Sequence, residues 1–383
     1  MAAWAILTAL FALPVASAKF SATTSATGSW AATDAFAIGT LYGWGSNASG
    51  LLGLGDKQDR SSPTPVNTGG SWQRVTVGPT HTCARQTSLM WCTGANTYGQ
   101  LGLGDTTERL VLTQVAGTGW AEMSAGETHT CATQTTRALY CWGRNNAGQL
   151  GLGDMTNRNG PVQVGTATAW IAVAAGFEHT CSLRNNHSLW CWGRNSSGQL
   201  GLGDLATRTG PVQVGSGWTA VATGYTHTCA LRTNHTLWCW GDNTYGQLGL
   251  GDTTYRTGPV QVGTANGWSA VSAGRIHTCA TQLNGTLWCW GRNASSQLGL
   301  GDATDRLAPV QVGTAVTWAT ITAGRAHTCA VRGDNTQWCW GNNTYGQLAT
   351  GDTTTRTTPT QISGSVSRVL KTGPDAYSTF SVK

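Results

Sequence analysis

The chain has 383 residues, including 52 glycines, 19 tryptophans and 12 cysteines, and only 10% of its residues are charged. This length is ample for a large hydrophobic core, and tryptophans at recurring positions exclude a disordered, fully solvated chain. The formal net charge of +6 is small and scattered, so it does not indicate a nucleic-acid-binding protein.

The first 18 residues resemble a secretory signal peptide. An apolar run covers Ala5–Leu13, and Ala16–Ala18 offers a small-residue cleavage site, although no Lys or Arg precedes the run. We expect this segment either to be removed or to remain as an apolar arm. Residues 19–35 are rich in Ser, Thr and Ala and are expected to form a flexible or O-glycosylated lead-in. No other stretch reaches the roughly 20 apolar residues of a membrane span.

Residues 36–383 repeat one phrase seven times. Its clearest form is Gly-Gln-Leu-Gly-Leu-Gly-Asp, as at Gly148–Asp154. The terminal Asp returns every 48 to 50 residues, at Asp56, Asp105, Asp154, Asp204, Asp252, Asp302 and Asp352. A period near 50 predicts a solenoid or propeller, and here it favours one closed array over two or three separate domains.

Each repeat contains four short segments with strand character, bounded by Gly, Asn and Pro. One set consists of Trp218–Val221, a strand around His227–Cys229, a strand around Leu237–Gly241 and the segment Pro259–Val262. Segments 36–47 and 365–383 match the second and first halves of a repeat. The fold class predicted is all-β, a seven-bladed β-propeller of four-stranded blades, closed by a blade shared between the two chain ends.

The cysteines fall in six pairs, two in each complete repeat. Two cysteines that face each other on neighbouring antiparallel strands can form a disulfide, and a secretory route allows its oxidation. The expected pairs are Cys83–Cys92, Cys131–Cys141, Cys181–Cys191, Cys229–Cys239, Cys279–Cys289 and Cys329–Cys339. The split repeat lacks both cysteines, with Gly43 in one place and Ser378 or Thr379 in the other. A ring of metal sites built from His-x-Cys is the alternative.

These phrases resemble the RCC1-repeat family. The matching motifs are Trp-Gly-x-Asn-x-x-Gly-Gln-Leu-Gly-Leu-Gly-Asp, then Pro-x-x-Val, then Gly-x-x-His-Thr-Cys-Ala-Leu, over residues 36–383. The resemblance implies a seven-bladed propeller closed by strands from both ends. The founding member is a nuclear exchange factor for a small GTPase that also binds chromatin, and secreted bacterial relatives include a β-lactamase inhibitor protein that binds through one propeller face. The resemblance therefore implies the fold and not one activity.

Each loop Asp is followed four residues later by an Arg, namely Arg60, Arg109, Arg158, Arg208, Arg256, Arg306 and Arg356. We expect these arginines to stabilise the loops by pairing with the Asp; a ring of positive charge for an acidic partner is the alternative. Six histidines share one strand position, namely His81, His129, His179, His227, His277 and His327. They are expected to be hydrogen-bonded blade residues, whereas His187 and His235 lie at hairpin tips.

Little in the sequence indicates catalysis. No Ser-His-Asp, paired-carboxylate, HExxH or P-loop arrangement stands out from the repeat. Glutamate, a common general acid or base, occurs only at Glu108, Glu122, Glu127 and Glu178. We therefore expect no enzyme activity, catalytic residue, cofactor or metal. Acidic loops such as Asp302–Asp305 are an alternative Ca²⁺ site, but they lack the DxDxDG pattern.

N-glycosylation sequons recur at two loop positions, both expected to be exposed turns. They begin at Asn47, Asn186, Asn195, Asn234, Asn284, Asn293 and Asn342. Together with the cysteines and the apparent signal, they predict an extracellular, secreted glycoprotein.

The loops of the repeats look like near copies, which suits self-assembly or many weak contacts with a repetitive ligand. The first functional hypothesis is therefore a secreted scaffold that assembles with itself into a matrix, coat or filament, with the N-terminal arm linking subunits. The alternative is a soluble extracellular binding module, either a protein inhibitor or a lectin-like protein that stacks sugars on Tyr98, Tyr245 and Tyr345. A GTPase exchange factor is the third hypothesis, and free thiols would be its signature.

Overall fold

The computed structural model describes residues 39–66, 69–366 and 369–382. The expected signal segment (1–18) and lead-in (19–35) lie outside the described residues. All secondary-structure elements named in the described residues are β-strands. No helix in this part of the chain is long and apolar enough to cross a membrane.

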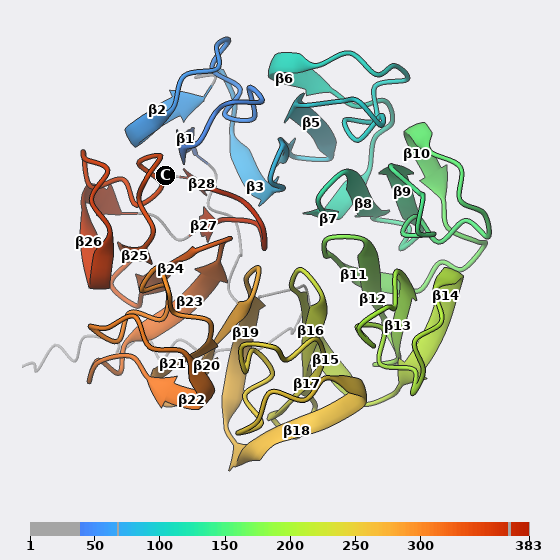
Figure 1. The fold of residues 1–383 in the computed structure, drawn as a ribbon. Helices are drawn as coiled ribbons and strands as arrows, with labels where there is room; N and C mark the ends of the chain where they lie inside the picture. Colours follow the sequence, from blue (N-terminus) through green and yellow to red (C-terminus); the bar gives the residue numbers. More distant parts are fainter. Residues whose placement is uncertain (1–38, 67–68, 367–368, 383) are drawn as a thin grey trace, which may run out of the picture.

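The strands form seven four-stranded antiparallel blades around a central axis (Figure 1). Blade 1 consists of β3 (Trp72–Val77), β4 (His81–Gln86), β5 (Leu89–Gly94) and β6 (Arg109–Gln114). Blade 2 consists of β7 (Trp120–Ala125), β8 (His129–Gln134), β9 (Leu139–Gly143) and β10 (Arg158–Gln163). Blade 3 consists of β11 (Trp170–Ala175), β12 (His179–Arg184), β13 (Leu189–Gly193) and β14 (Arg208–Gly215).

The next blades repeat this order from the axis outward. Blade 4 consists of β15 (Trp218–Thr223), β16 (His227–Arg232), β17 (Thr236–Gly241) and β18 (Arg256–Asn266). Blade 5 consists of β19 (Trp268–Ala273), β20 (His277–Gln282), β21 (Leu287–Gly291) and β22 (Arg306–Gln311). Blade 6 consists of β23 (Trp318–Ala323), β24 (His327–Arg332), β25 (Thr336–Gly341) and β26 (Arg356–Val366).

Blade 7 combines strands from both ends of the chain, as the sequence predicts. Its inner strands are β27 (Val369–Lys371) and β28 (Ser378–Val382), and its outer strands are β1 (Leu41–Gly45) and β2 (Arg60–Val66). β1 pairs antiparallel with β28 from Leu41↔Val382 to Gly45↔Ser378. This pairing closes the ring, so every blade packs against two neighbours, and blade 7 contacts both blade 1 and blade 6.

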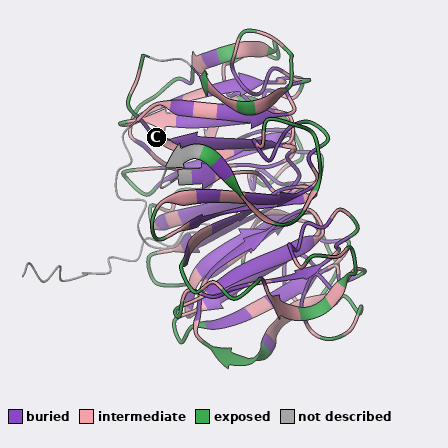
Figure 2. Cartoon of the chain, turned by 90° about the vertical axis from the view of Figure 1, so that its left-hand side faces the viewer, coloured by how far each residue is buried: buried purple, intermediate pink, exposed green. Residues whose placement is uncertain are grey.

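The core lies between adjacent blades, where buried strands stack face to face (Figure 2). Trp192 of blade 3 is fully buried there, and its indole Nε1 donates a hydrogen bond to the Gln149 carbonyl of blade 2 across 2.9 Å. The preceding blade leaves room for this ring through Gly151, whose φ is 72° and where a Cβ would lie 2.7 Å from Trp192 Nε1. The repeated Gly of the phrase therefore serves inter-blade packing.

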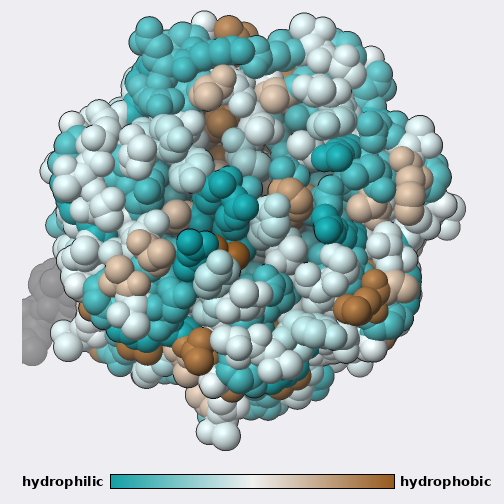
Figure 3. Space-filling view, viewed as in Figure 1, coloured by the Kyte–Doolittle hydropathy of each residue, from teal (hydrophilic) through white to brown (hydrophobic). Residues whose placement is uncertain are grey.

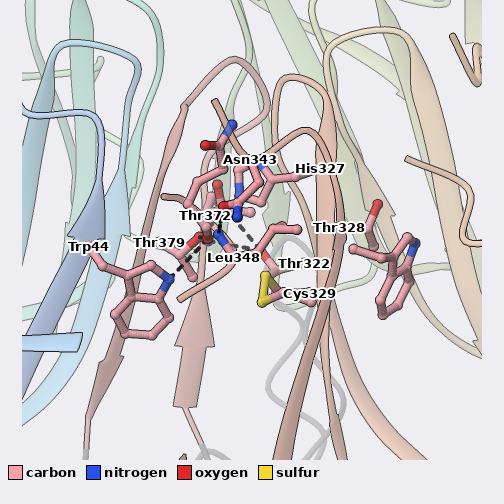
Figure 4. The surroundings of a disulfide bond; sticks show 12 residues. Trp44, Thr322, His327, Thr328, Cys329, Asn343, Leu348, Thr372 and Thr379 are labelled. Atoms are coloured by element: carbon pink, nitrogen blue, oxygen red, sulfur yellow. Dashed lines mark hydrogen bonds between the residues drawn. A yellow bond between two sulfur atoms is a disulfide. The ribbon is translucent and has the colours of Figure 1, made fainter. Parts of the chain in front are cut away.

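All six expected disulfides form, and they use all twelve cysteines. Each joins directly opposed residues of the second and third strands of one blade, as in Cys329↔Cys339 (Figure 4). The expectation that Ser378 or Thr379 occupies the position of the first cysteine in blade 7 is wrong. Phe380 pairs with Gly43 there, and a Cβ on Gly43 would lie 2.8 Å from the Phe380 ring. A large ring over a bare glycine thus replaces the disulfide.

The inner strands of all blades line a central cavity of about 80 Å³, whose walls are mostly Ala, Ser, Thr and Val side chains. Such a space accommodates a few water molecules and no larger ligand.

Candidate functional site

The antiparallel order places two kinds of loop on each face of the propeller. One face carries the loop from the first to the second strand of each blade, which we call the inner loop, and the loop from the third to the fourth strand, which we call the outer loop. Backbone hydrogen bonds join the inner and outer loops of a blade. In blade 1, Ala95 N–H of the outer loop donates to the Thr80 carbonyl of the inner loop at 2.9 Å. We call this the inner-loop face. The opposite face carries the turns between the second and third strands and is called the hairpin-tip face.

The Asp and Arg of every outer loop form an ion pair, with Arg nitrogen to Asp oxygen distances of 2.5–2.7 Å. The same carboxylate accepts the backbone N–H two residues later, as in Thr156 N to Asp154 at 2.9 Å. These hydrogen bonds and the Arg charge hold the pKa of each Asp below its usual range, down to about 2 at Asp352. The seven arginines are thus neutralised within the loops that they stabilise.

The Asn that follows Trp-Gly is the second fixed part of the outer loop. Asn195 is fully buried; its Nδ2 donates to the Asp204 carbonyl at 2.9 Å, and its Oδ1 accepts the Leu200 N–H at 2.9 Å. Asn47 and Asn293 are buried in the same way. The prediction that these three sequons lie in exposed turns is therefore wrong. Asn186, Asn234 and Asn284 are exposed at the hairpin tips, and Asn342 is half-buried.

The six recurring histidines are fully buried and lie between blades. His179 Nε2 lies 3.0 Å from the Thr228 hydroxyl of the next blade, and the other five make the same contact. Among the described residues, no group of three or more His, Cys, Asp or Glu side chains is arranged to hold a metal ion. The described residues therefore contain no ligand set for the metal site from His-x-Cys or for the Ca²⁺ site in the Asp-rich loops.

The inner loops, in contrast, differ from blade to blade. The residue after the repeated Gly of this loop is Pro79, Glu127, Phe177, Tyr225, Arg275, Arg325 and Pro374 in blades 1 to 7. The expectation that the loops are near copies holds for the outer loops and is wrong for the inner ones. Since the neighbouring framework is repeated, this variation is not explained by the fold alone.

Two carboxylates of the inner loops each hold two arginines. Glu178 lies 2.8 Å from Arg194 and 3.8 Å from Arg144. Asp375 lies 3.1 Å from Arg275 and 3.4 Å from Arg325. Each group therefore has one positive charge in excess of its carboxylate. Strongly hydrophilic side chains gather near the centre of the face shown in Figure 3.

Aromatic rings support this charged cluster. The rings of Phe177 and Tyr225 lie 3.8 Å apart between centroids, and the Arg275 guanidinium lies 4.6 Å over Tyr225. Three further arginines lie over tyrosines on this face, in the pairs Arg144–Tyr98, Arg292–Tyr245 and Arg325–Tyr377. The tyrosines that the sequence offers as sugar-stacking groups thus have guanidinium or, for Tyr345, a second tyrosine ring as neighbours. Stacking fixes the arginines in place.

Glu127 is the carboxylate of this cluster that forms no ion pair within the described residues. Its Oε2 is buried and has no hydrogen-bond partner. Burial, followed by the charges of Asp375 and Glu178, raises the pKa of Glu127 to about 7. Residues 127, 178 and 375 are far apart in the sequence, so sequence reasoning singled out none of them as members of one site. The signal in the sequence that could have indicated this site is the position after the repeated Gly, which differs from blade to blade.

The comparison with known proteins assigns the family. Models of the regulator of chromosome condensation (RCC1) repeat match residues 39–85, 89–133, 138–183, 186–231, 234–281, 284–331 and 334–372. The chain belongs to the RCC1-repeat family. A second RCC1 repeat model matches five segments between residues 120 and 347. No curated protein matches the sequence.

Solved structures of RCC1-like propellers share the fold at low identity. Human WBSCR16 is 18% identical with a TM-score of 0.81, over 90% of this chain and 98% of that chain. Prp20p from Saccharomyces cerevisiae, described for its binding to Gsp1p and histones, is 20% identical with a TM-score of 0.81, over 90% and 91%. Yeast RCC1 bound to Kap60 is 19% identical with a TM-score of 0.81, over 100% and 97%. At these identities the likeness concerns the fold alone.

Proposed function

We propose that this RCC1-repeat propeller is an extracellular binding protein whose protein partner docks on the inner-loop face. The observation that carries the proposal is the blade-to-blade variation of the inner loops on an otherwise repeated framework. A surface that recognises one partner needs different groups at different places, whereas a structural loop is free to repeat. The six disulfides support an oxidising, extracellular environment.

The chemistry of the inner-loop face suits a protein partner. Tyrosine and arginine are enriched among residues that dominate binding energy in protein interfaces. Here Arg275 and Arg325 are held by Asp375 and by the rings of Tyr225 and Tyr377, so less side-chain entropy is lost on binding. The central cavity has a volume of only about 80 Å³, which favours recognition by the loops on the face itself.

Site-specific photocrosslinking tests the proposal. Tyr225→p-benzoylphenylalanine places a crosslinker in the inner loop of blade 4, and Leu283→p-benzoylphenylalanine is the control at an exposed residue of the opposite, hairpin-tip face. In the extracellular fraction of the source organism, we expect one discrete adduct from position 225 only. Excess wild-type protein should suppress the adduct, while the Arg275→Glu/Arg325→Glu variant should not. Equal adducts from both positions would contradict a partner on this face.

Self-assembly into a scaffold is the second candidate, favoured by the seven equivalent Asp–Arg outer loops around the rim. Electron microscopy of the unreduced, untagged protein separates the two. Regular filaments or sheets support the scaffold, and isolated rings support the binding protein. Exchange of nucleotide on a small GTPase has less support, because no cysteine is left as a free thiol.

A further inference from the structure

The hairpin-tip face carries a second kind of site, at the ends of the second strands in blades 3, 4 and 6. Arg184 lies opposite Trp170 in the sheet, and its guanidinium lies 4.3 Å from that ring and 4.1 Å from the ring of Trp190. Arg232 lies over Trp218 and Trp238 at 4.6 and 4.3 Å. Arg332 lies over Trp318 and Trp338 at 4.7 and 4.0 Å. Each guanidinium is held between two indoles that meet edge to face.

These three arginines form no close ion pair within the described ranges, although the Arg332 charge acts on the nearby Asp334 carboxylate. None lies within ion-pairing distance of a carboxylate among the described residues, in contrast to the paired arginines of the outer loops. In each case the Nε atom is buried without a hydrogen-bond partner. A buried, unpaired donor on a cation costs free energy that an anionic acceptor offsets. Three guanidinium groups without a close carboxylate are therefore on this face.

The site in blade 3 opens into a pocket of about 470 Å³ between blades 2 and 3. The pocket is lined by Trp170, Arg184 and Trp190 and by the segments Gly151–Gly153, Gln163–Ala167 and Gly210–Pro211. Trp170 is 1% exposed, and its indole Nε1 has no hydrogen-bond partner. The pocket has the size of a small-molecule site and places the partly exposed Trp190 ring beside a fixed positive charge.

We propose that the three Arg–Trp–Trp sites, centred on Arg184, Arg232 and Arg332, bind acidic sugar units of an extracellular polysaccharide. The apolar face of a pyranose ring stacks on an indole, and its carboxylate or sulfate pairs with the guanidinium. The three copies around one ring allow a long chain to bind at several sites at once, so weak single contacts add up to useful avidity. This surface is separate from the inner-loop face and does not depend on the function proposed for it.

Blade 5 supplies a natural control. Its rings Trp268 and Trp288 keep the same edge-to-face geometry at 6.4 Å, but Gln282 occupies the Arg position opposite Trp268. Arg184→Gln, Arg232→Gln and Arg332→Gln therefore install a residue that this fold already accepts. The reverse change, Gln282→Arg, is expected to create a fourth site.

The test is a titration of the unreduced, full-length protein with a heparin-derived tetrasaccharide, followed by tryptophan fluorescence and calorimetry. We expect about three binding sites, at least a tenfold weaker affinity for the triple Arg→Gln variant, and an additional site in the Gln282→Arg variant. Arg137→Gln removes an exposed arginine of the same face whose backbone carbonyl accepts from Trp170 N but whose guanidinium lies over no ring pair of the described residues, and we expect it to change affinity less than twofold. Maltotetraose, which is uncharged, should bind at least tenfold more weakly than the sulfated sugar.

Three outcomes would overturn the proposal. The triple variant and the wild type could bind the tetrasaccharide equally, which would make the attraction nonspecific. Maltotetraose could bind as tightly as the sulfated sugar, which would leave the arginines without a role. A single-stranded oligonucleotide could bind more tightly than the tetrasaccharide in 150 mM salt, which would assign the sites to a different polyanion.

Discussion

His327 Nε2 lies 3.0 Å from the Thr379 hydroxyl, and this contact joins blade 6 to the blade that contains both chain ends (Figure 4). The Thr379 hydroxyl donates its own proton to the Gln347 carbonyl at 3.1 Å, so it can only accept from the imidazole. His327 therefore carries a proton on Nε2, and burial, which lowers its pKa to about 3, keeps the ring neutral. Its Nδ1 is buried without a hydrogen-bond partner, and the five equivalent histidines share this arrangement.

The buried histidines predict that acid unfolds the propeller. Burial lowers the pKa of His81 and His227 to about 4 and of the other four to about 3, below the ordinary value of 6.5. The unfolded chain thus binds more protons below pH 6.5, and stability that is present above this pH is lost as the pH falls toward 4. Each histidine contributes up to about 1.4 kcal/mol per pH unit in this window.

Urea denaturation at pH values from 7.5 to 4.5 checks this prediction. The free energy of unfolding should fall steeply below pH 6.5, by several kcal/mol at pH 5 when six histidines act together. His187→Gln/His235→Gln removes the two histidines at the hairpin tips and should leave the slope unchanged. A flat profile between pH 7 and 5 would contradict the neutral, buried state of the histidines.

The sequons should divide into used and unused sites. When the chain is expressed through a eukaryotic secretory pathway, we expect glycans on Asn186, Asn234 and Asn284, whose side chains are exposed at the hairpin tips. Asn47, Asn195 and Asn293 should remain unmodified in the folded protein, because a glycan on Nδ2 would displace the buried hydrogen bonds to the loop Asp. Mass spectrometry of glycopeptides measures each occupancy. A glycan on Asn195 of correctly folded protein would contradict the buried loop geometry.

The last complete blade offers a substitution that should increase stability. Ala349 stands where other repeats have Gly, and its φ is 57°, a conformation that costs an L-residue about 1–2 kcal/mol. Ala349→Gly removes this strain but adds freedom to the unfolded chain, so we expect a gain of about 0.5–1 kcal/mol. The matched change Gly151→Ala should destabilise by about 2–3 kcal/mol, because the new Cβ would meet Trp192 as well as an unfavourable φ. Chemical denaturation measures the free energy of unfolding of both variants. A change of the same sign and size in both would contradict the backbone strain assigned to Ala349.

Much of the architecture could be predicted from the sequence because the repeat places the same residue type at the same structural position. The spacing of Asp154 and its equivalents predicts the blades, and the joint loss of both cysteines in the split repeat predicts one disulfide per blade. Phe380 could not be assigned, since the weakened repeat at residues 365–383 tolerates a shift of one residue in alignment. The register of β28 against β1 removes this ambiguity.

The sites were harder to predict, for two physical reasons. Asn195 belongs to a surface-type motif, yet the outer loop folds over its side chain and buries it. Glu127, Glu178 and Asp375 come from blades 2, 3 and 7, and only the closure of the ring brings their charges together. The sequence of one repeat cannot reveal a cluster whose members come from several repeats and meet near the axis.

Glu127 predicts a pH dependence opposite to that of the histidines. Because burial and two neighbouring carboxylates raise its pKa to about 7, the folded protein binds this proton more tightly than the unfolded chain does, whose pKa is near 4.5. The stabilisation that comes from this tighter proton binding is fully present below pH 4.5 and is lost as the pH rises through 7. Glu127→Gln has no charge to bury, so we expect it to be more stable than the wild type at pH 8 by about 1 kcal/mol, after allowance for its partial exposure.

Urea denaturation at pH 8 and pH 4.5 tests this difference, with Glu108→Gln as a control at a carboxylate paired with Lys57 on the rim. The gain at position 127 should vanish at pH 4.5, where the wild-type carboxyl is already protonated, and the control should show no gain at pH 8. A carboxylate that is kept at a cost in stability supports the recognition site proposed for the inner-loop face. Loss of stability in Glu127→Gln at pH 8 would instead assign this carboxylate to holding the inner loops together.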